Sequence, residues 1–219
     1  MSKLQIIGAL MKKEIALELK TRYAISSLGL FVLAVAFLVY YTTEGVVSQS
    51  EWWSYYWIIL VFVSIQAVVK SFLVEHQSRQ YYLAQLASPA QIILSKTLYH
   101  ILLLFLCGLL IWGVMALFLI NPVKEPLQFL GVLFLGTTGI AGVFTLFSGI
   151  ASRASGNFTI LAVMCFPIMI PFIKLLVSQC KAMSIQPNQN LIVLFLLLAL
   201  LDVAVIAMGM ILFPYIWRE

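Results

Sequence analysis

Charged residues are scarce in this sequence. Asp, Glu, Lys and Arg make up 10% of its 219 residues, whereas hydrophobic residues make up 63%. Soluble domains carry about 25% charged residues, and a chain of this length cannot hide so much apolar surface in one soluble core. The composition therefore excludes a soluble globular protein and predicts a single membrane domain over residues 1–219. The net charge of +5 then indicates contact with lipid headgroups, not with nucleic acid.

Motifs for catalysis, nucleotide binding and metal binding are also missing. No G-x-x-x-x-G-K-[ST] sequence occurs, so the chain has no ATP-binding P-loop. The three cysteines lack metal-ligand spacing. The two histidines, His76 and His100, form no H-E-x-x-H pattern. We expect a surface His76 and an interfacial His100, with a haem-ligand role as the alternative for either. These absences predict a non-catalytic protein without a metal site or a cofactor of its own.

Long apolar runs dominate the chain instead. A transmembrane helix needs about 20 apolar residues to cross about 30 Å of hydrocarbon. The runs do not alternate with period two, so they favour helices over strands. The predicted fold is all-α, with six transmembrane helices at about 24–42, 53–74, 97–120, 127–151, 158–178 and 191–216.

Basic residues predict the orientation of these spans. Most of the 13 Lys and Arg residues lie in the N-terminal segment, the loop after the second span, the loop after the fourth span or the C-terminus. The positive-inside rule therefore places both termini in the cytoplasm. Trp and Tyr residues at 52–57 then lie at the outer end of the second span, where an aromatic belt is expected. The Trp-rich outer loop beside them is a candidate contact for a partner subunit.

Residues 1–22 predict an interfacial helix on the cytoplasmic side. Its apolar stripe consists of Leu4, Ile7, Met11, Ile15 and Leu19. Such an amphipathic helix lies in the plane of the membrane surface. Two acidic residues, Glu14 and Glu18, interrupt the stripe, and the alternative is a helix that simply continues the first span.

The loop at 75–96, which begins "EHQSRQYYLAQLASPAQ", is polar but has helical periodicity. Leu83, Leu86 and Ala87 share one face of a short amphipathic helix. Ser88 is suited to cap a second helix, and Pro89 suits its first position. This second helix is predicted to run into the third span. A helix exposed in this way is suited to dock in a groove of a soluble partner.

A carboxylate lies in the middle of the last span. Asp202 is flanked by the apolar sequence "LLLALLDVAVIAM", where a charge costs about 2.5–3.5 kcal/mol on insertion scales. One interpretation is a residue of a substrate path or proton relay. The other is a hydrogen bond to a neighbouring span that serves packing alone.

Two spans carry features of helix geometry. Pro167 and Pro171 fall in the fifth span, where each removes a backbone donor and favours a kink or a break. Such a bend would serve either a conduit or packing. In the fourth span, small residues recur every four positions and predict a helix-packing face. They are Thr137, Ala141, Thr145 and Gly149.

Three segments together resemble the CcmB family, the haem exporter protein B of cytochrome c maturation and an ABC-2-type permease. They are "FLVEHQSRQYYLAQLASPAQIILSKTLYH" (72–100), "LGTTGIAGVFTLFSGIASRASGN" (135–157) and "FPIMIP" (166–171). The first contains an acidic residue, a leucine-rich helix, a proline corner and a Lys-x3-His sequence. The resemblance covers nearly the whole chain.

The resemblance implies a multi-pass permease of the bacterial inner membrane. Its partners would be a CcmA-like ATPase that binds the ATP, CcmC-like and CcmD-like membrane subunits, and a CcmE-like haem chaperone. Haem would be handled by the complex, and the permease would pair with a second copy or with another membrane subunit. The implied ATPase-coupling element comprises Glu75, Arg79, Leu83, Leu86 and Pro89.

Two other functions fit the same sequence. One is an ABC-2 permease that exports a different substrate, such as a lipid or a polysaccharide. The other is a stand-alone proton-coupled carrier that uses Asp202. A membrane-embedded enzyme is disfavoured, because His, Asp, Ser and Cys residues do not cluster on one side of the membrane.

Overall fold

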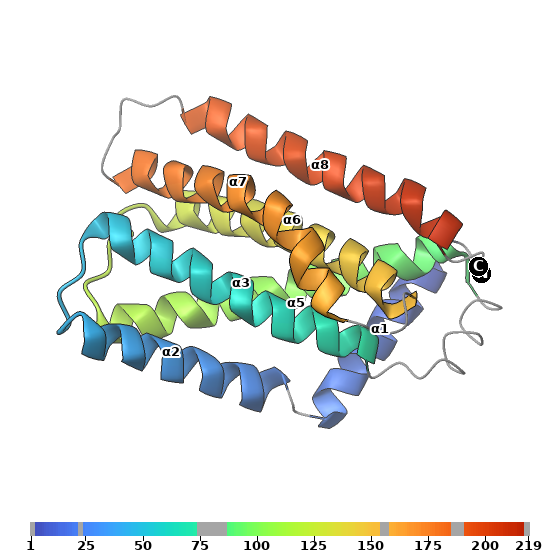
Figure 1. Ribbon diagram of the computed structural model, residues 1–219, viewed down its shortest axis with the longest axis horizontal. Helices are drawn as coiled ribbons and strands as arrows, with labels where there is room; N and C mark the ends of the chain where they lie inside the picture. The colour runs from blue at the N-terminus through green and yellow to red at the C-terminus, as the bar shows by residue number, and fades with distance from the viewer. Residues whose placement is uncertain (1–2, 22–23, 74–86, 154–157, 185–190, 217–219) are drawn as a thin grey trace.

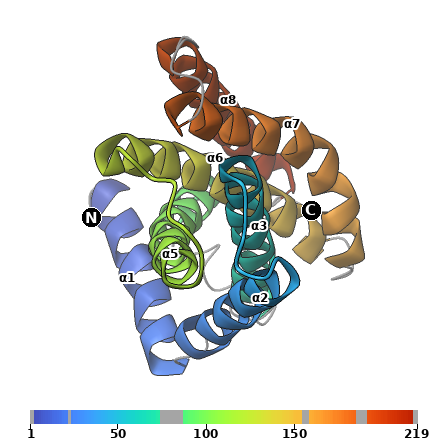
Figure 2. The ribbon, with the colours of Figure 1, turned by 90° about the vertical axis from the view of Figure 1, so that its left-hand side faces the viewer.

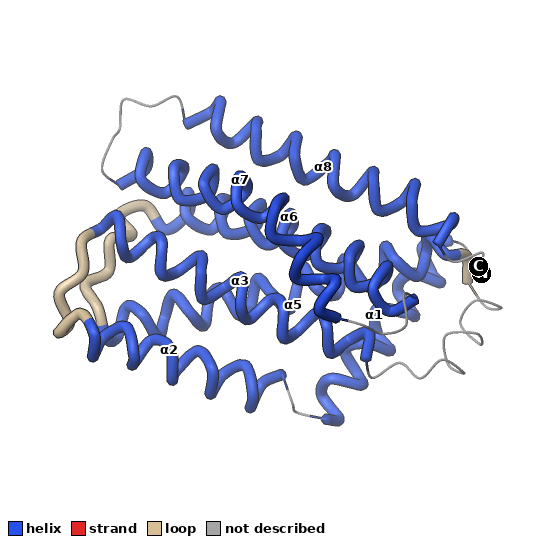
Figure 3. Tube along the Cα trace, viewed as in Figure 1, coloured by secondary structure: helices blue, strands red, loops and turns tan. Residues whose placement is uncertain are grey.

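The computed structural model describes residues 3–21, 24–73, 87–153, 158–184 and 191–216. Within these ranges every regular element is helical and none is a strand (Figure 3). The elements are α1 Lys3–Thr21, a short π-helical segment η1 Ala24–Leu28, α2 Gly29–Thr42, α3 Gln49–Leu73, α5 Pro89–Phe118, α6 Pro126–Arg153, α7 Phe158–Ser184 and α8 Leu191–Ile216. The predicted all-α class is confirmed.

Four helical stretches are long and apolar enough to cross a membrane. They are Pro89–Phe118, Pro126–Ser152, Met164–Ser184 and Leu191–Leu212. These correspond to the last four predicted spans and fit a membrane protein. The first predicted span coincides with a shorter apolar helix, Ser26–Thr42, and the second with α3. The count of six spans and the orientation of the termini stay predictions.

The helices α2, α3, α5, α6, α7 and α8 form an elongated bundle, and α1 lies across one end of it (Figures 1 and 2). We call this end the base. It holds α1, the last turn of α3 and the first turns of α5. The connections from α2 to α3 and from α5 to α6 lie at the opposite end.

Helix α6 is the centre of the bundle. It contacts α3, α5, α7 and α8, and every residue from 136 to 149 is buried. All four residues of the predicted packing face, Thr137, Ala141, Thr145 and Gly149, lie within this stretch. Lipid gives membrane helices little hydrophobic reason to associate, so small residues that permit close contact carry much of the packing.

The closest approaches to α6 occur at two glycines outside that predicted face. A Cβ atom at Gly136 would lie 2.5 Å from the Trp57 ring of α3. A Cβ atom at Gly139 would overlap Phe172 of α7 and Asp202 of α8. The glycines therefore let α3, α7 and α8 all reach the backbone of α6.

The aromatic residues at the start of α3 fill the core instead of forming a membrane-surface belt. Trp52, Trp53, Tyr56 and Trp57 are each at most 1% exposed. The Trp52 and Tyr56 rings stack with centroids 5.6 Å apart. Trp57 Nε1 donates to Cys180 Sγ at 3.4 Å and Tyr56 Oη donates to the Gly108 carbonyl at 3.0 Å, so neighbouring helices satisfy the polar atoms of these two side chains. The prediction of a belt is therefore wrong for these four side chains, and the two tryptophans of the predicted outer loop, Trp52 and Trp53, are buried within this chain.

Helix α7 runs through Pro167 and Pro171 without a break. Figure 1 shows it changing direction along its length. Both proline side chains are exposed on the outer surface of the bundle. They therefore do not point into a conduit within this chain.

Candidate functional site

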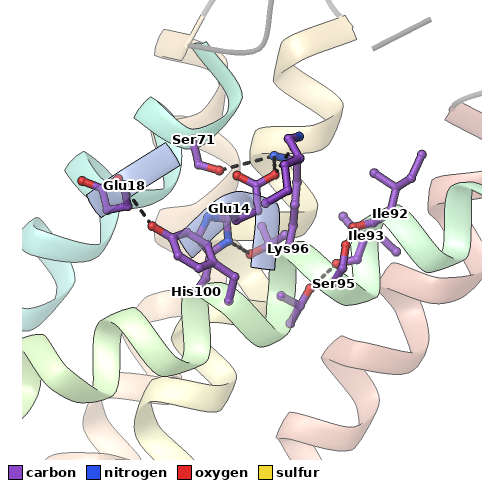
Figure 4. Close-up of polar contacts among 12 residues, drawn as sticks. Glu14, Glu18, Ser71, Ile92, Ile93, Ser95, Lys96 and His100 are labelled. Carbon is purple, nitrogen blue, oxygen red and sulfur yellow. Dashed lines mark hydrogen bonds and ion pairs between the residues drawn. The ribbon is translucent and has the colours of Figure 1, made fainter. Parts of the chain in front are cut away.

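A buried ion pair connects α1 to α5 at the base. Lys96 Nζ of α5 lies 3.2 Å from Glu14 Oε1 of α1 (Figure 4). Lys96 is 2% exposed and Glu14 is 9% exposed. Lys13, which precedes Glu14 in the sequence, also places its Nζ atom 3.2 Å from Glu14 Oε1. Removing one partner of such a buried pair typically costs about 3–5 kcal/mol, because the other charge stays buried without compensation.

The same lysine also contacts the end of α3. Lys96 Nζ donates to Ser71 Oγ at 3.4 Å and lies 4.9 Å from the centre of the Phe72 ring, a cation–π distance. One ammonium group therefore connects α1, α3 and α5. We call Glu14, Ser71 and Lys96 the base cluster.

Local sequence explains where α5, the helix that carries Lys96, begins. Ser88 is the N-cap residue of α5, and its backbone N–H donates a hydrogen bond to Gln91 Oε1 at 2.9 Å. Pro89 occupies the first turn of the helix. The predicted corner at these residues, and the continuous helix from it into the third span, are both present. Lys96 thus stands about two turns inside one uninterrupted helix.

One face of α1 meets α5 at intervals of four residues. Ile6 and Leu10 pack against Ala87 and Ile92 of the start of α5. Glu14 follows with its ion pair, and Glu18 Oε2 accepts a hydrogen bond from Tyr99 Oη at 3.4 Å. The acidic residues that interrupt the amphipathic stripe are therefore the ones that contact α5.

The predicted apolar stripe of α1 lies beside this face. Ile7, Met11 and Ile15 are half-buried, and Leu19 is 61% exposed. The side chain of Leu4 lies outside the described residues. The exposure of the other four is compatible with contact between this stripe and a membrane surface.

His100 stands one turn beyond Lys96 and points to α6. It is fully buried, and its Nδ1 lies 2.7 Å from Thr145 Oγ1. The histidine is buried because other helices cover the first turns of α5, and its position relative to the membrane interface stays a prediction. His76 lies outside the described residues. No group of three His, Cys, Asp or Glu side chains that would hold a metal ion occurs in the described part of the chain.

Most of the predicted coupling element cannot be placed. Glu75, Arg79, Leu83 and Leu86 fall in 74–86, outside the described residues, and only Pro89 is seen, at the start of α5. The base cluster was not among the predicted site residues. Its signal in the sequence was the presence of opposite charges, Glu14 and Lys96, on two segments assigned to the same side of the membrane.

Asp202 is packed inside the bundle, away from the base cluster. It is 4% exposed and faces Gly139 and Phe172. Neither carboxylate oxygen has a hydrogen-bond partner among the residues that the structure describes. The packing interpretation required a hydrogen bond from Asp202 to a neighbouring span, and the described residues provide no such bond.

We expect Asp202→Asn to leave function and stability close to those of the unmodified chain. The amide has the same size, and the carboxyl group has no hydrogen bond among the described residues that the substitution would remove. Thermal unfolding in detergent and cytochrome c maturation in cells measure the two effects. A ΔpH-dependent flux through the isolated chain that disappears in Asp202→Asn would instead support the proton-coupled carrier.

Comparison with protein-family models shows which family this chain belongs to. A family model described as the CcmB protein matches residues 5–215. The chain belongs to the CcmB family. Searches of curated proteins and of solved structures give no match.

Membership in the CcmB family gives the chain its broad role. CcmB proteins are membrane permease subunits of the ABC type, generally non-catalytic, that act in haem transport and cytochrome c biogenesis. The apolar helices agree with a multi-pass membrane protein. The matched range contains the whole base cluster, from Glu14 to Lys96.

Proposed function

We propose that this CcmB-family chain couples ATP hydrolysis by a separate ATPase subunit to haem export, or to release of a haem-loaded chaperone, during cytochrome c maturation. The sequence carries no P-loop, so ATP binds to the partner. We place the chain in the bacterial inner membrane with both termini in the cytoplasm. CcmC-like and CcmD-like subunits, a CcmE-like chaperone and a second permease or equivalent membrane subunit complete the assembly.

The continuity of α5 is the observation that carries this proposal. The predicted coupling loop, residues 75–96, extends into a helix of 30 residues that begins at Pro89. We call the first part of this loop, residues 75–86, the coupling segment. At 1.5 Å per residue this helix is about 45 Å long. It lacks a proline beyond its first turn, so a displacement at its start is transmitted along the bundle.

A double substitution in the coupling segment tests the proposal. Glu75→Lys with Leu86→Asp reverses one charge and places another on the apolar face of the amphipathic helix. Charge mismatch at an interface costs several kcal/mol, so the ATPase recovered with the permease should fall by about tenfold or more. Co-purification in detergent with quantification of both subunits measures this loss.

The matched control makes the same changes at the opposite end of the bundle. Glu125 and Leu127 are both exposed there, beside the start of α6. Glu125→Lys with Leu127→Asp should retain the ATPase at the level of the unmodified chain, and both double variants should insert normally. Equal recovery of ATPase with the two variants would contradict the coupling assignment.

A further inference from the structure

The Lys96 side chain connects the two helices that flank the coupling segment, α3 before it and α5 after it. Ser71 and Phe72 lie just before the segment, and Lys96 lies two turns into the helix that follows it. Lys96 Nζ reaches Ser71 Oγ at 3.4 Å and the Phe72 ring at 4.9 Å. A force applied to either helix end therefore acts on α3 and α5 together, because Lys96 connects them.

The same ammonium group extends this connection to α1. Its 3.2 Å contact with Glu14 is buried, where electrostatic attraction is stronger than in water. Figure 4 shows Glu14 and Ser71 approaching Lys96 from two different helices. Sliding α1 away from α5 would separate the Lys96 ammonium group from the Glu14 carboxylate, although both residues are buried.

Further contacts fix α1 on both sides of the ion pair. Ile6 and Leu10 meet Ala87 and Ile92 before it, and Glu18 meets Tyr99 after it. The contacts follow α1 along its length, so this helix is attached over several turns. No other element that the structure describes makes so extended a contact with α1 (Figure 2).

We propose that Lys96 is a positioning residue that makes α1, the end of α3 and the first turns of α5 move as one unit when the ATPase acts. This inference rests on the proposed coupling function and adds a second moving part to it. The movement that the ATPase causes displaces α1, the amphipathic helix at the membrane surface, as well as the transmembrane helices. Lys96, which is outside the coupling segment itself, determines whether α1 follows.

The first test uses the full chain alone in detergent. Lys96→Met keeps the aliphatic stem and removes the ammonium group. Amide hydrogen exchange in α1 should then rise by about tenfold or more, since a buried charge pair has been opened. The reversed pair, Glu14→Lys with Lys96→Glu, should return the exchange rate toward that of the unmodified chain.

The control for this test is Lys12→Met, which removes an exposed lysine from α1 itself. It should leave exchange in α1 unchanged. If Lys96→Met does not accumulate as folded protein, Glu14→Gln with Lys96→Met replaces it, because this variant removes both charges of the buried Glu14–Lys96 pair. Exchange in α1 that is the same in the Lys96 and Lys12 variants would overturn the proposal.

The second test uses the complex with the ATPase. Addition of ATP should change exchange in residues 89–96 in every variant. Exchange in α1 should change in the unmodified chain and in the reversed pair, but not in Glu14→Gln with Lys96→Met. A response of α1 that persists in this neutral variant would refute the positioning role. If ATP has no effect even on the unmodified complex, the coupling function fails, whereas the detergent test still judges the attachment of α1.

Discussion

Gly139→Val should prevent most of the chain from reaching its folded, membrane-inserted form. A Cβ atom at this position would overlap Phe172 of α7 and Asp202 of α8, and valine adds two further methyl groups. Overpacking of a core typically costs about 1–3 kcal/mol, occasionally more. We expect the upper end here, because α7 and α8 both contact α6 through this glycine. The fraction of protein that remains monodisperse on gel filtration after heating in detergent measures the effect.

Gly113→Val is the matched control for this substitution. Gly113 is also in the interior of a long helix, α5, but a Cβ atom there would meet no atom within 4 Å. Gly113 itself is exposed on the outside of the bundle. The control should fold at the level of the unmodified chain. If both valine variants lose the same fraction of folded protein, the close approach at Gly139 is not what limits folding.

Trp57→Ala should destabilise the bundle by about 3–5 kcal/mol, the range for deletion of a large buried aromatic side chain. The ring is fully buried against Gly136 and lies 5.2 Å from the Tyr56 ring, measured between centroids. The substitution also removes the N–H that donates to Cys180. Thermal unfolding in detergent, followed by the remaining tryptophan fluorescence, measures this loss.

Phe62→Ala provides the comparison on the same helix. Phe62 is 48% exposed, on the outer surface of α3. Its removal should cost less than about 1 kcal/mol, as is usual for sites away from the core. An equal loss of stability in the two variants would mean that Trp57 does not have the core position described here.

The start of α5 shows what a single sequence can predict. Ser88 and Pro89 act on the backbone of the turns beside them, so their meaning is contained in a few neighbouring residues. The same holds for the long apolar helices, whose length and composition suffice. The all-α fold class, the long apolar helices and the helix that follows the coupling segment were therefore predictable.

The base cluster and the aromatic core were not predictable for a different reason. Glu14 and Lys96 are 82 residues apart, and their pairing depends on how α1 crosses α5. The Trp-rich start of α3 has the same composition as a surface belt, and only its contacts with α5, α6 and α7 make it a core. Tertiary packing, which local patterns do not encode, decides both.

The central position of α6 has a consequence for how the protein is made. Two of the helices that cover it, α7 and α8, are synthesised after it. Until they arrive, Gly139 and Gly142 on that side of α6 face lipid or the insertion machinery. Assembly of the bundle around its axis is therefore completed late, and a ribosome that stalls before α8 leaves a membrane-embedded chain whose middle is uncovered.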